Sequence, residues 1–491
     1  MNQLTVFELN ALARKALIKN GFAPEFSPQV IEAAESLDEK EVISKAAADP
    51  SVRDLRSLLW SSIDNASSLD LDQAEYAEKL PNGDIRLLVG IADVDAFVPK
   101  NSALDDFAAR NTVSIYAGSH VYPMLPERLS TDLTSLREGA DRLAVVTEIV
   151  VCLDGDVKEV NIYRAILRNY AKLSYEETGA WLDGRGKIPP RVAEVSGMED
   201  QIRIQQETAG RLHKLRRKNG TLEFETIESK PVFENGKIAD LQFEPPNAAR
   251  DIIENFMVAA NVKMAEFLED EKVLSLRRVV ENPARWNRIV ELAKSFGTHL
   301  PENPDSVALS QFLVQRRITD PVHFPDLSLS VIKLLGAGDY VVRQPGGEAA
   351  DGHFGLAVAD YTHSTAPNRR YTDLIVQRLV KAAIAGKPSP YDFEELTVIA
   401  AHCNERESAA RKVERQMRKT IAAGVMASRV GETFDAIVTG TNAAGTFARI
   451  LRPPVDGRVV KGESGLKVGE KIRVRLLAVD APRGFIDFAG V

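Results

Sequence analysis

The sequence has little of what secreted and membrane proteins depend on. Its 491 residues include only two cysteines, Cys152 and Cys403, so no disulfide framework is predicted and a reducing compartment is favoured. No uninterrupted apolar run is long enough to span a membrane, and the first residues, MNQLTVFELNALARK, lack the apolar core of a signal peptide. His353 and His363 show no zinc-ligand spacing with a partner, so we assign them no metal and no general-base role. We expect a soluble, cytoplasmic protein without a membrane partner.

The chain also lacks an excess of positive charge, with 62 lysines and arginines against 70 aspartates and glutamates. The formal net charge is −8, which is unlike a protein that simply coats nucleic acid, because phosphate contacts need lysine and arginine. An enzyme that encloses a strand needs positive charge only along its channel, whereas any one basic cluster is also typical of an ordinary solvated helix face. The basic residues are clustered at 213–218, at Arg369 and Arg370, and on a predicted helix at 405–419.

Negative charge is concentrated in one short stretch, IDNASSLDLDQA at 63–74. It carries Asp64, Asp70 and Asp72 with no basic residue between them, and carboxylates this close repel one another. Shared divalent cations relieve that repulsion most naturally, because hard oxygen ligands suit Mg²⁺. The spacing does not fit an EF-hand loop. The alternative interpretation is a solvated acidic turn in which Asp64 or Ser67 caps a helix.

Longer motifs surround this stretch. The first part of the chain contains WSSIDNASSLDLDQAEY, VGIADVDAFVPKNSALDDFAARNTVSIY and YPMLPERLSTDLTSLREG, and HFGLAVADYTHSTAPNRRYTDLIVQRLV follows about 300 residues after the first. In this order they resemble the two signatures of the ribonuclease II family, the RNB exoribonucleases. RKNGTLEFE and IIENFMVAANVKMAEFL also resemble that family. The resemblance therefore covers roughly two-thirds of the chain.

The hydrophobic pattern between 51 and 385 predicts one large mixed α/β domain, which the resemblance identifies as the RNB catalytic domain. Turn signals separate its strand-like runs, and the helix predicted at 249–269 carries an apolar stripe typical of core packing rather than of a ligand pocket. The predicted strands are 85–94, 143–153 and 160–168, and the other predicted helix is 198–218.

The two ends of the chain differ from this domain. Residues 1–50 predict short helices, with an apolar stripe that includes Phe7 and a cap at Ser27. This segment is too short for the paired cold-shock barrels of many ribonuclease II relatives, so we expect either an RNA clamp or a packing appendage. Residues 386–430 predict a helical bridge. Short alternating strands at 431–491 predict an all-β OB barrel that resembles the RNA-binding domain of ribosomal protein S1 type.

By resemblance, Asp64, Asp70 and Asp72 match three of the four aspartates of the family's metal-binding motif, and are expected to be both catalytic and metal-binding. The fourth position is Gln73, whose amide oxygen can bind a cation but carries no charge. Such a site would hold its cations less tightly and deprotonate metal-bound water less readily. Gln73 marks either a subfamily in which another carboxylate completes the site, with Asp93 as a candidate, or a weakened activity. A structural role is the other interpretation of Asp93.

The resemblance also implies contacts with a substrate. Arg369 matches a catalytic arginine at the scissile phosphate, a task suited to a guanidinium that binds two oxygens. Tyr116 matches an aromatic residue that packs against the last nucleotides, and a partly buried structural tyrosine is the alternative. Glu414 matches a glutamate near the 3′ terminal nucleotide. Arg370 is expected to be structural or to contact a backbone phosphate.

The predicted barrel offers further RNA contacts. Phe434 and Phe447 provide faces for base stacking, and Arg449, Lys471 and Arg473 lie nearby in the sequence for phosphates. Phenylalanines in so small a barrel are also common in the core. For each phenylalanine, a contact with RNA and a place in the barrel core are therefore equally favoured.

The family resemblance implies a 3′→5′ exoribonuclease that removes 5′-mononucleotides from single-stranded RNA with Mg²⁺ or Mn²⁺. The lack of an obvious heptad repeat favours a monomer. One alternative is a catalytically weakened RNA-binding protein on the RNB fold, for which Gln73 is the reason. The other is a metal-dependent hydrolase of small phosphodiesters, and the terminal barrel argues against it. Deleting residues 431–491 separates the exoribonuclease from the small-phosphodiester hydrolase. The hydrolase would keep its activity, whereas the exoribonuclease would lose affinity for long RNA.

Overall fold

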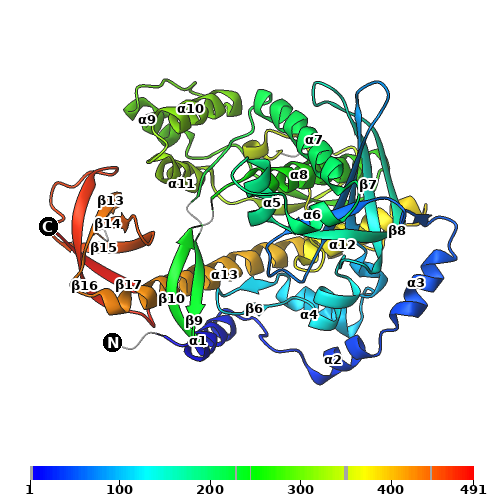
Figure 1. The fold of residues 1–491 in the computed structure, drawn as a ribbon, viewed down its shortest axis with the longest axis horizontal. Coiled ribbons are helices and arrows are strands. Elements are labelled where there is room, and N and C mark those ends of the chain that lie inside the picture. Colours follow the sequence, from blue (N-terminus) through cyan, green and yellow to red (C-terminus); the bar gives the residue numbers. More distant parts are fainter. Residues whose placement is uncertain (1–3, 227–228, 244, 348–351, 443–444) are drawn as a thin grey trace.

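The computed structural model describes residues 4–226, 229–243, 245–347, 352–442 and 445–491. Figure 1 shows a large mixed α/β body, a small β-barrel, and the long helix α13 (Phe393–Met426) that runs from the body to the barrel. Among the described residues, no helix is both long and apolar enough to cross a membrane.

A six-stranded sheet forms the centre of the α/β body, in the order β1-β8-β2-β3-β4-β7. Because β7 also pairs with β8, the sheet closes on itself. The strands predicted around β4, β7 and β8 are confirmed. The six strands are β1 (Arg53–Asp54), β2 (Trp60–Asp64), β3 (Gln73–Lys79), β4 (Ile85–Ala92), β7 (Asp141–Val151) and β8 (Val157–Ser174).

Tight turns join β3 to β4 and β7 to β8, where the sequence carries its turn signals. Gly83 and Gly155 adopt φ angles of +86° and +91°, a region that glycine enters without a steric penalty. The amide of Leu80 donates to the carbonyl of Asp84 across the first turn (2.8 Å). These turns fix the antiparallel register of the two hairpins.

Helices cover both faces of the sheet. Ile252 and Phe256 of α8 pack into one core with Ile91 of β4, so the apolar stripe of α8 is a core face as predicted. On the other face, α12 packs into the core that contains Trp60. The helices of this body are α4 (Ala103–Asn111), α5 (Tyr175–Leu182), α6 (Pro190–Glu194), α7 (Met198–Lys218), α8 (Ala248–Asp270) and α12 (Tyr371–Ile384).

Three further helices form a small core of their own beside the sheet. They are α9 (Trp286–Ser295), α10 (Ser306–Thr319) and α11 (Phe324–Leu335). Three two-stranded sheets complete the body. Their strands are β5 (Ile115–Tyr116), β6 (Val121–Tyr122), β9 (Ser229–Glu234), β10 (Lys237–Phe243), β11 (Ser275–Val279) and β12 (Asp339–Arg343).

The predicted N-terminal helices are present as α1 (Val6–Lys19), α2 (Pro28–Glu35) and α3 (Glu39–Ala47). Ser27 caps α2 as predicted. Arg406 of α13 donates to the carbonyls of Asn20 and Gly21, both at 2.9 Å, and so ties the end of α1 to α13. The predicted apolar stripe of α1 is wrong at Phe7, which is 82% exposed. At 3.6 residues per turn, Phe7 lies on the face of the helix opposite the buried Leu9, Ala13 and Ala16.

Five strands close into the predicted barrel, in the order β13-β14-β15-β17-β16. Arg449 of the barrel pairs with Asp326 of α11 (2.9 Å), so the barrel is held against the three-helix core as well as against α13. The strands are β13 (Thr433–Asn442), β14 (Gly445–Ile450), β15 (Val455–Lys461), β16 (Lys471–Asp480) and β17 (Phe485–Gly490).

Candidate active site

The acidic stretch lies at the edge of the sheet where β2 ends and β3 begins. Asp64 is the last residue of β2 and Gln73 is the first of β3, and the two strands pair antiparallel, so both ends of the loop lie together. The carboxylate of Asp64 accepts hydrogen bonds from the amide of Asn65 (2.7 Å) and the hydroxyl of Ser68 (2.9 Å). The loop, which the structure describes throughout, contains no helix. The alternative in which Asp64 or Ser67 caps a helix is therefore wrong.

Asp72 joins the two distant motifs in space. Its carboxylate accepts hydrogen bonds from the amide of Asn368 (3.1 Å) and from Nε of Arg369 (3.3 Å), residues 296 and 297 positions along the chain. Burial raises the pKa of Asp72 to about 7, against the opposing effects of Arg369 and Asn368. The Arg369 side chain is 46% exposed. Its guanidinium is therefore paired with Asp72 yet still accessible to a substrate phosphate.

Asp70 adds a third carboxylate to this place. Burial raises the pKa of Asp70, and the negative charge of Asp64 raises it further, while Arg369 lowers it. Charges influence each other this way only over short distances in a protein. The structure thus brings Asp64, Asp70, Asp72 and Arg369 into one area, and their catalytic and metal-binding roles stay predictions.

The donor chemistry of this area fits a hard divalent cation. Oxygen ligands are concentrated there, and their mutual repulsion is the penalty that a bound cation relieves. Among the residues that the structure describes, no three histidine, cysteine or acidic side chains surround a single point. Asp72 points instead toward Asn368 and Arg369. Binding a cation would therefore draw the carboxylates together from the arrangement seen here.

Tyr116 and Glu414 come from two other elements and meet beside the carboxylates. The backbone amide of Tyr116, in β5, donates to the carboxylate of Glu414 on α13 (3.1 Å). Burial raises the pKa of Tyr116 to about 12, and the charges of Arg369 and Asp70 also act on it. The residue is 42% exposed, so the aromatic ring has an open face. Burial also raises the pKa of Glu414.

Arg370 has a structural partner. Its guanidinium donates to both oxygens of Asp373 (2.9 and 2.7 Å), and Asp373 in turn accepts the amide of Ala366 (2.8 Å). This network holds the turn that precedes α12 and so positions Arg369. The observed contacts of Arg370 are structural, and its contact with a substrate stays a prediction.

Gln73 and Asp93 occupy different surroundings. Gln73 is buried, and its amide Nε2 donates to the carbonyl of Ile63 (3.3 Å), which leaves the amide oxygen as its possible metal ligand. Asp93 pairs with Lys381 (2.7 Å) and with Arg164 (3.4 Å). The suggestion that Asp93 replaces the missing metal carboxylate is therefore wrong, and its structural interpretation is supported.

The sequence interpretation missed Glu75. It lies two residues beyond Gln73 on the same face of β3, because side chains alternate along a strand. The residue is 0% exposed, and neither carboxylate oxygen has a hydrogen-bond partner among the described residues. Burial raises its pKa well above the ordinary value, and Asp64 raises it further. Nothing in the local sequence around Glu75 (QAEYAEK) indicates this burial.

Tyr175 is a second residue that the sequence interpretation did not single out. It is the first residue of α5, which Ser174 at the end of β8 caps. Burial raises its pKa, and the nearby charges of Asp64 and Glu75 raise it further. The guanidinium of Arg250 lies over its ring, 4.7 Å from the centroid. Tyr175 therefore borders the carboxylate area, and only the β8–α5 connection brings it there.

Some of the predicted RNA contacts of the barrel are wrong, and the others stay predictions. Phe434 is 7% exposed and belongs to the barrel core, so its role in base stacking is wrong. Arg449 is also a wrong phosphate ligand, because it is buried and pairs with Asp326 (2.9 Å). Phe447 is only partly buried, and its contact with RNA stays a prediction. Lys471 and Arg473 are exposed, and their contact with phosphates also stays a prediction.

Comparisons with known proteins agree with this architecture. Residues 52–386 match the RNB domain, and residues 432–491 match the RNase II-type exonuclease C-terminal S1 domain. The chain is 29% identical to Ribonuclease R 1 of Lactococcus lactis over 94% of its own length and 59% of that protein. It is 31% identical to Ribonuclease R of Thermotoga maritima, over 94% of its own length and 68% of that protein.

A solved structure of Mycoplasma genitalium RNase R in complex with ribose-methylated single-stranded RNA is also similar. It superimposes with a TM-score of 0.87 at 24% identity, over 98% of this chain and 78% of that chain. The chain spans 59% of the length of the Lactococcus relative. The RNB match, in turn, covers most of the residues of the present chain. On this evidence the chain belongs to the RNB-domain family.

Proposed function

We propose that this protein is a metal-dependent 3′→5′ exoribonuclease that hydrolyses single-stranded RNA to 5′-mononucleotides. The single observation that carries the proposal is the meeting of Asp72 with Asn368 and Arg369. It places a carboxylate suited to a metal ion next to an accessible guanidinium suited to a phosphate, and phosphodiester hydrolysis needs both. The names of the similar proteins agree with this reaction.

In this proposal Asp64, Asp70 and Asp72 hold Mg²⁺ or Mn²⁺, with the amide oxygen of Gln73 as a fourth donor. The bound cation would supply Lewis acidity and a water of lowered pKa. Arg369 binds the phosphoryl oxygens of the scissile link, since a guanidinium offers two parallel donors and stays charged. Asp72 has to be ionised for this task, and Arg369 favours that form.

The remaining predicted contacts position the end of the strand. Tyr116 packs the open face of its ring against the last bases. Glu414 accepts the backbone amide of Tyr116 and lies near the 3′ terminal nucleotide. Phe447, Lys471 and Arg473 on the barrel hold RNA farther from the active site. The proposal places the protein in the cytoplasm, because both cysteines are free. It includes a monomer, because the sequence has no obvious heptad repeat.

The test is a time course on 5′-labelled poly(A) with Mg²⁺. We expect the labelled strand to shorten step by step from its 3′ end to a short limit product, with AMP released. A strand that stays full length, or that is cut internally from the start, would contradict the proposal.

Gln73 supports a second candidate function. Its amide is engaged by the carbonyl of Ile63 and has no charge to offer a cation, which favours a catalytically weakened RNA-binding protein on the RNB fold. Such a protein would bind poly(A) with an affinity that falls steeply with salt and leave it intact. Gain of cleavage in Gln73→Asp would support this second function over the first.

A further inference from the structure

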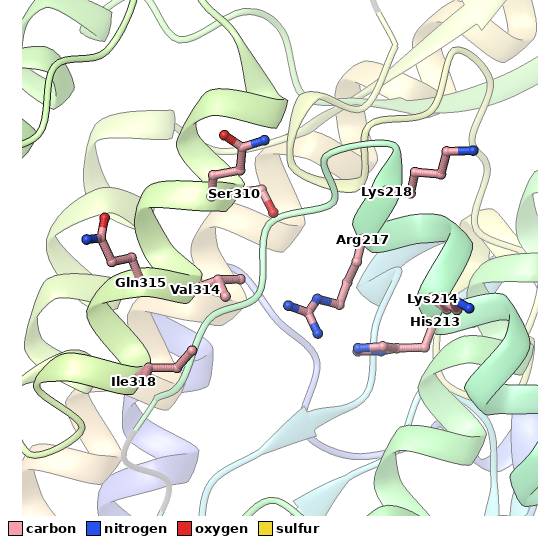
Figure 2. A pocket seen from close by; sticks show the side chains of 9 residues that line it. His213, Lys214, Arg217, Lys218, Ser310, Val314, Gln315 and Ile318 are labelled. Atoms are coloured by element: carbon pink, nitrogen blue, oxygen red, sulfur yellow. The ribbon is translucent and has the colours of Figure 1, made fainter.

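A cleft of about 620 Å³ lies between α7 and α10, and no residue of the candidate active site lines it. Figure 2 shows Arg217 and His213 pointing from α7 toward α10, with Val314 and Ile318 pointing back from α10. Ile318 is 76% exposed, so its aliphatic surface is open to a ligand. The cleft therefore has a basic wall on α7. Its wall on α10 combines the aliphatic Val314 and Ile318 with polar side chains, which are Ser310, Gln311 and Gln315.

The two walls are held at a fixed spacing. The hydroxyl of Ser310 on α10 donates to the carbonyl of Thr221, just after α7 (2.9 Å). Gly220 adopts a φ of +93°, and a Cβ there would lie 2.8 Å from the backbone nitrogen of Val307. Only glycine allows this close approach. The cleft is thus built into the packing of α7 against α10 and needs no rearrangement to open.

The cleft carries a surplus of positive charge. Glu223 pairs with His213 (3.0 Å), Arg217 (3.3 Å) and Arg317 (3.1 Å), and Glu225 is a second partner of Arg317 (3.5 Å). Lys214 and Lys218 also line the cleft on α7, and neither has an ion-pair partner in the described part of the chain. In a protein whose net charge is −8, such a concentration of cations attracts a polyanion.

From this geometry we infer that the cleft between α7 and α10 is a second RNA-binding site, which holds a single-stranded segment outside the active site. Phosphates lie along Lys214 and Lys218 at the edge of α7. A base enters the cleft between the guanidinium plane of Arg217 and the aliphatic side chain of Ile318. The site extends the proposed function by a contact that involves no catalytic group.

Lys214→Gln/Lys218→Gln tests the phosphate contacts. The probe is a fluorescein-labelled 20-nucleotide poly(A), measured by anisotropy in EDTA over a series of NaCl concentrations. We expect about 5- to 10-fold weaker binding at low salt, and a slope of log Kd against log [NaCl] that is smaller by about 1.4, because two phosphate contacts on a single strand are lost. Lys40→Gln/Lys45→Gln on α3 removes the same charge from exposed positions that have no ion-pair partner among the described residues, and should change Kd less than about twofold.

Ile318→Ser tests the base contact separately. It should weaken binding several-fold without changing the salt slope, because it removes a stacking surface and no charge. Val398→Ser on α13, an equally exposed aliphatic position at 70%, is its matched control. A 5-nucleotide poly(A) that occupies only the active site should bind all of these variants as it binds the wild type.

Equal binding and equal salt slope for Lys214→Gln/Lys218→Gln and its control would overturn the inference. So would a loss of affinity for the 5-nucleotide strand equal to that for the 20-nucleotide strand, because the active site itself would then be changed. A loss of AMP binding with unchanged poly(A) binding would assign the cleft to a free nucleotide instead. Since these measurements need no cleavage, failure of the exoribonuclease proposal would leave them interpretable.

Discussion

The acidic edge of the sheet and the terminal barrel differ in how they bury charge. Among the described residues of the barrel, the buried charged side chain is Arg449, which is paired with Asp326 (2.9 Å), whereas the sheet edge buries Glu75 without a hydrogen-bond partner in the described part of the chain. At the sheet edge Asp72 and Glu75 are buried, although burial raises the pKa of both. The barrel fills its centre with apolar side chains such as Phe434, Val474 and Phe488. Burying a carboxylate is unfavourable unless something compensates it. The difference indicates that the sheet edge is built for chemistry, and that burial in the barrel serves stability.

Asp72→Asn should give the largest effect of the variants that test this contrast. We expect nucleotide release to fall about 10³-fold or more, because the site loses a metal-binding charge next to Arg369. The free energy of unfolding at pH 7 should change by less than about 1 kcal/mol, since burial already disfavours the ionised form.

Release kinetics and urea denaturation measure the two effects of Asp72→Asn. Asp106→Asn, at an exposed position of α4 that has no ion pair among the described residues, is the control and should change neither quantity. If Asp72→Asn kept normal activity but lost stability, Asp72 would be a structural residue, and the difference between the sheet edge and the barrel would no longer indicate chemistry.

Phe434→Ala and Phe447→Ala separate stability from binding within the barrel. Phe434→Ala should lower the free energy of unfolding by about 3–5 kcal/mol, because it leaves a cavity in a closed core. Phe447→Ala should cost less than about 1 kcal/mol and weaken binding of 20-nucleotide poly(A) about 5- to 10-fold. Thermal unfolding and anisotropy check the pair. Poly(A) binding that is unchanged in Phe447→Ala would leave the barrel without an aromatic RNA contact.

His353 should make the stability of the catalytic domain sensitive to acid. Burial lowers its pKa from 6.5 to about 4, and its Nδ1 accepts the amide of Leu356 (3.1 Å). Because the folded pKa is below the unfolded one, this stabilisation is present above about pH 6.5 and is lost as pH falls toward 4. Between pH 7 and pH 5 we expect a loss on the order of 1 kcal/mol.

His353→Asn is the matched variant, because asparagine keeps a side-chain acceptor for Leu356 but does not titrate in this range. Urea denaturation at both pH values should show a smaller pH dependence for the variant. An equal pH dependence in the two proteins would assign the acid sensitivity to other groups.

The backbone elements follow from local pattern in both regions. Alternation and turn glycines located β4, β7 and β8, and helical spacing located α7 and α8. The acidic motif located Asp64, Asp70 and Asp72, because closely spaced carboxylates without a basic neighbour need an explanation at the level of sequence. The closed barrel followed from short strands and glycine turns.

The surroundings of individual side chains were harder to predict from the sequence, because they depend on contacts between distant segments. Phe434 and Phe447 have the same chemistry, and only the strand register turns the first inward. Arg449 resembles a phosphate ligand until Asp326 of α11 covers it. Glu75 gains its importance from burial beside Asp64, which local pattern does not reveal.

The most direct test of the central claim is hydrolysis of poly(A) by the wild type in water enriched in ¹⁸O, with Mg²⁺ and product analysis by mass spectrometry. We predict that AMP accumulates from the 3′ end and that its 5′-phosphate carries one ¹⁸O atom, because water is the nucleophile. Absence of AMP, or release of nucleotide without ¹⁸O, would contradict an active site assembled from Asp72 and Arg369 for phosphodiester hydrolysis.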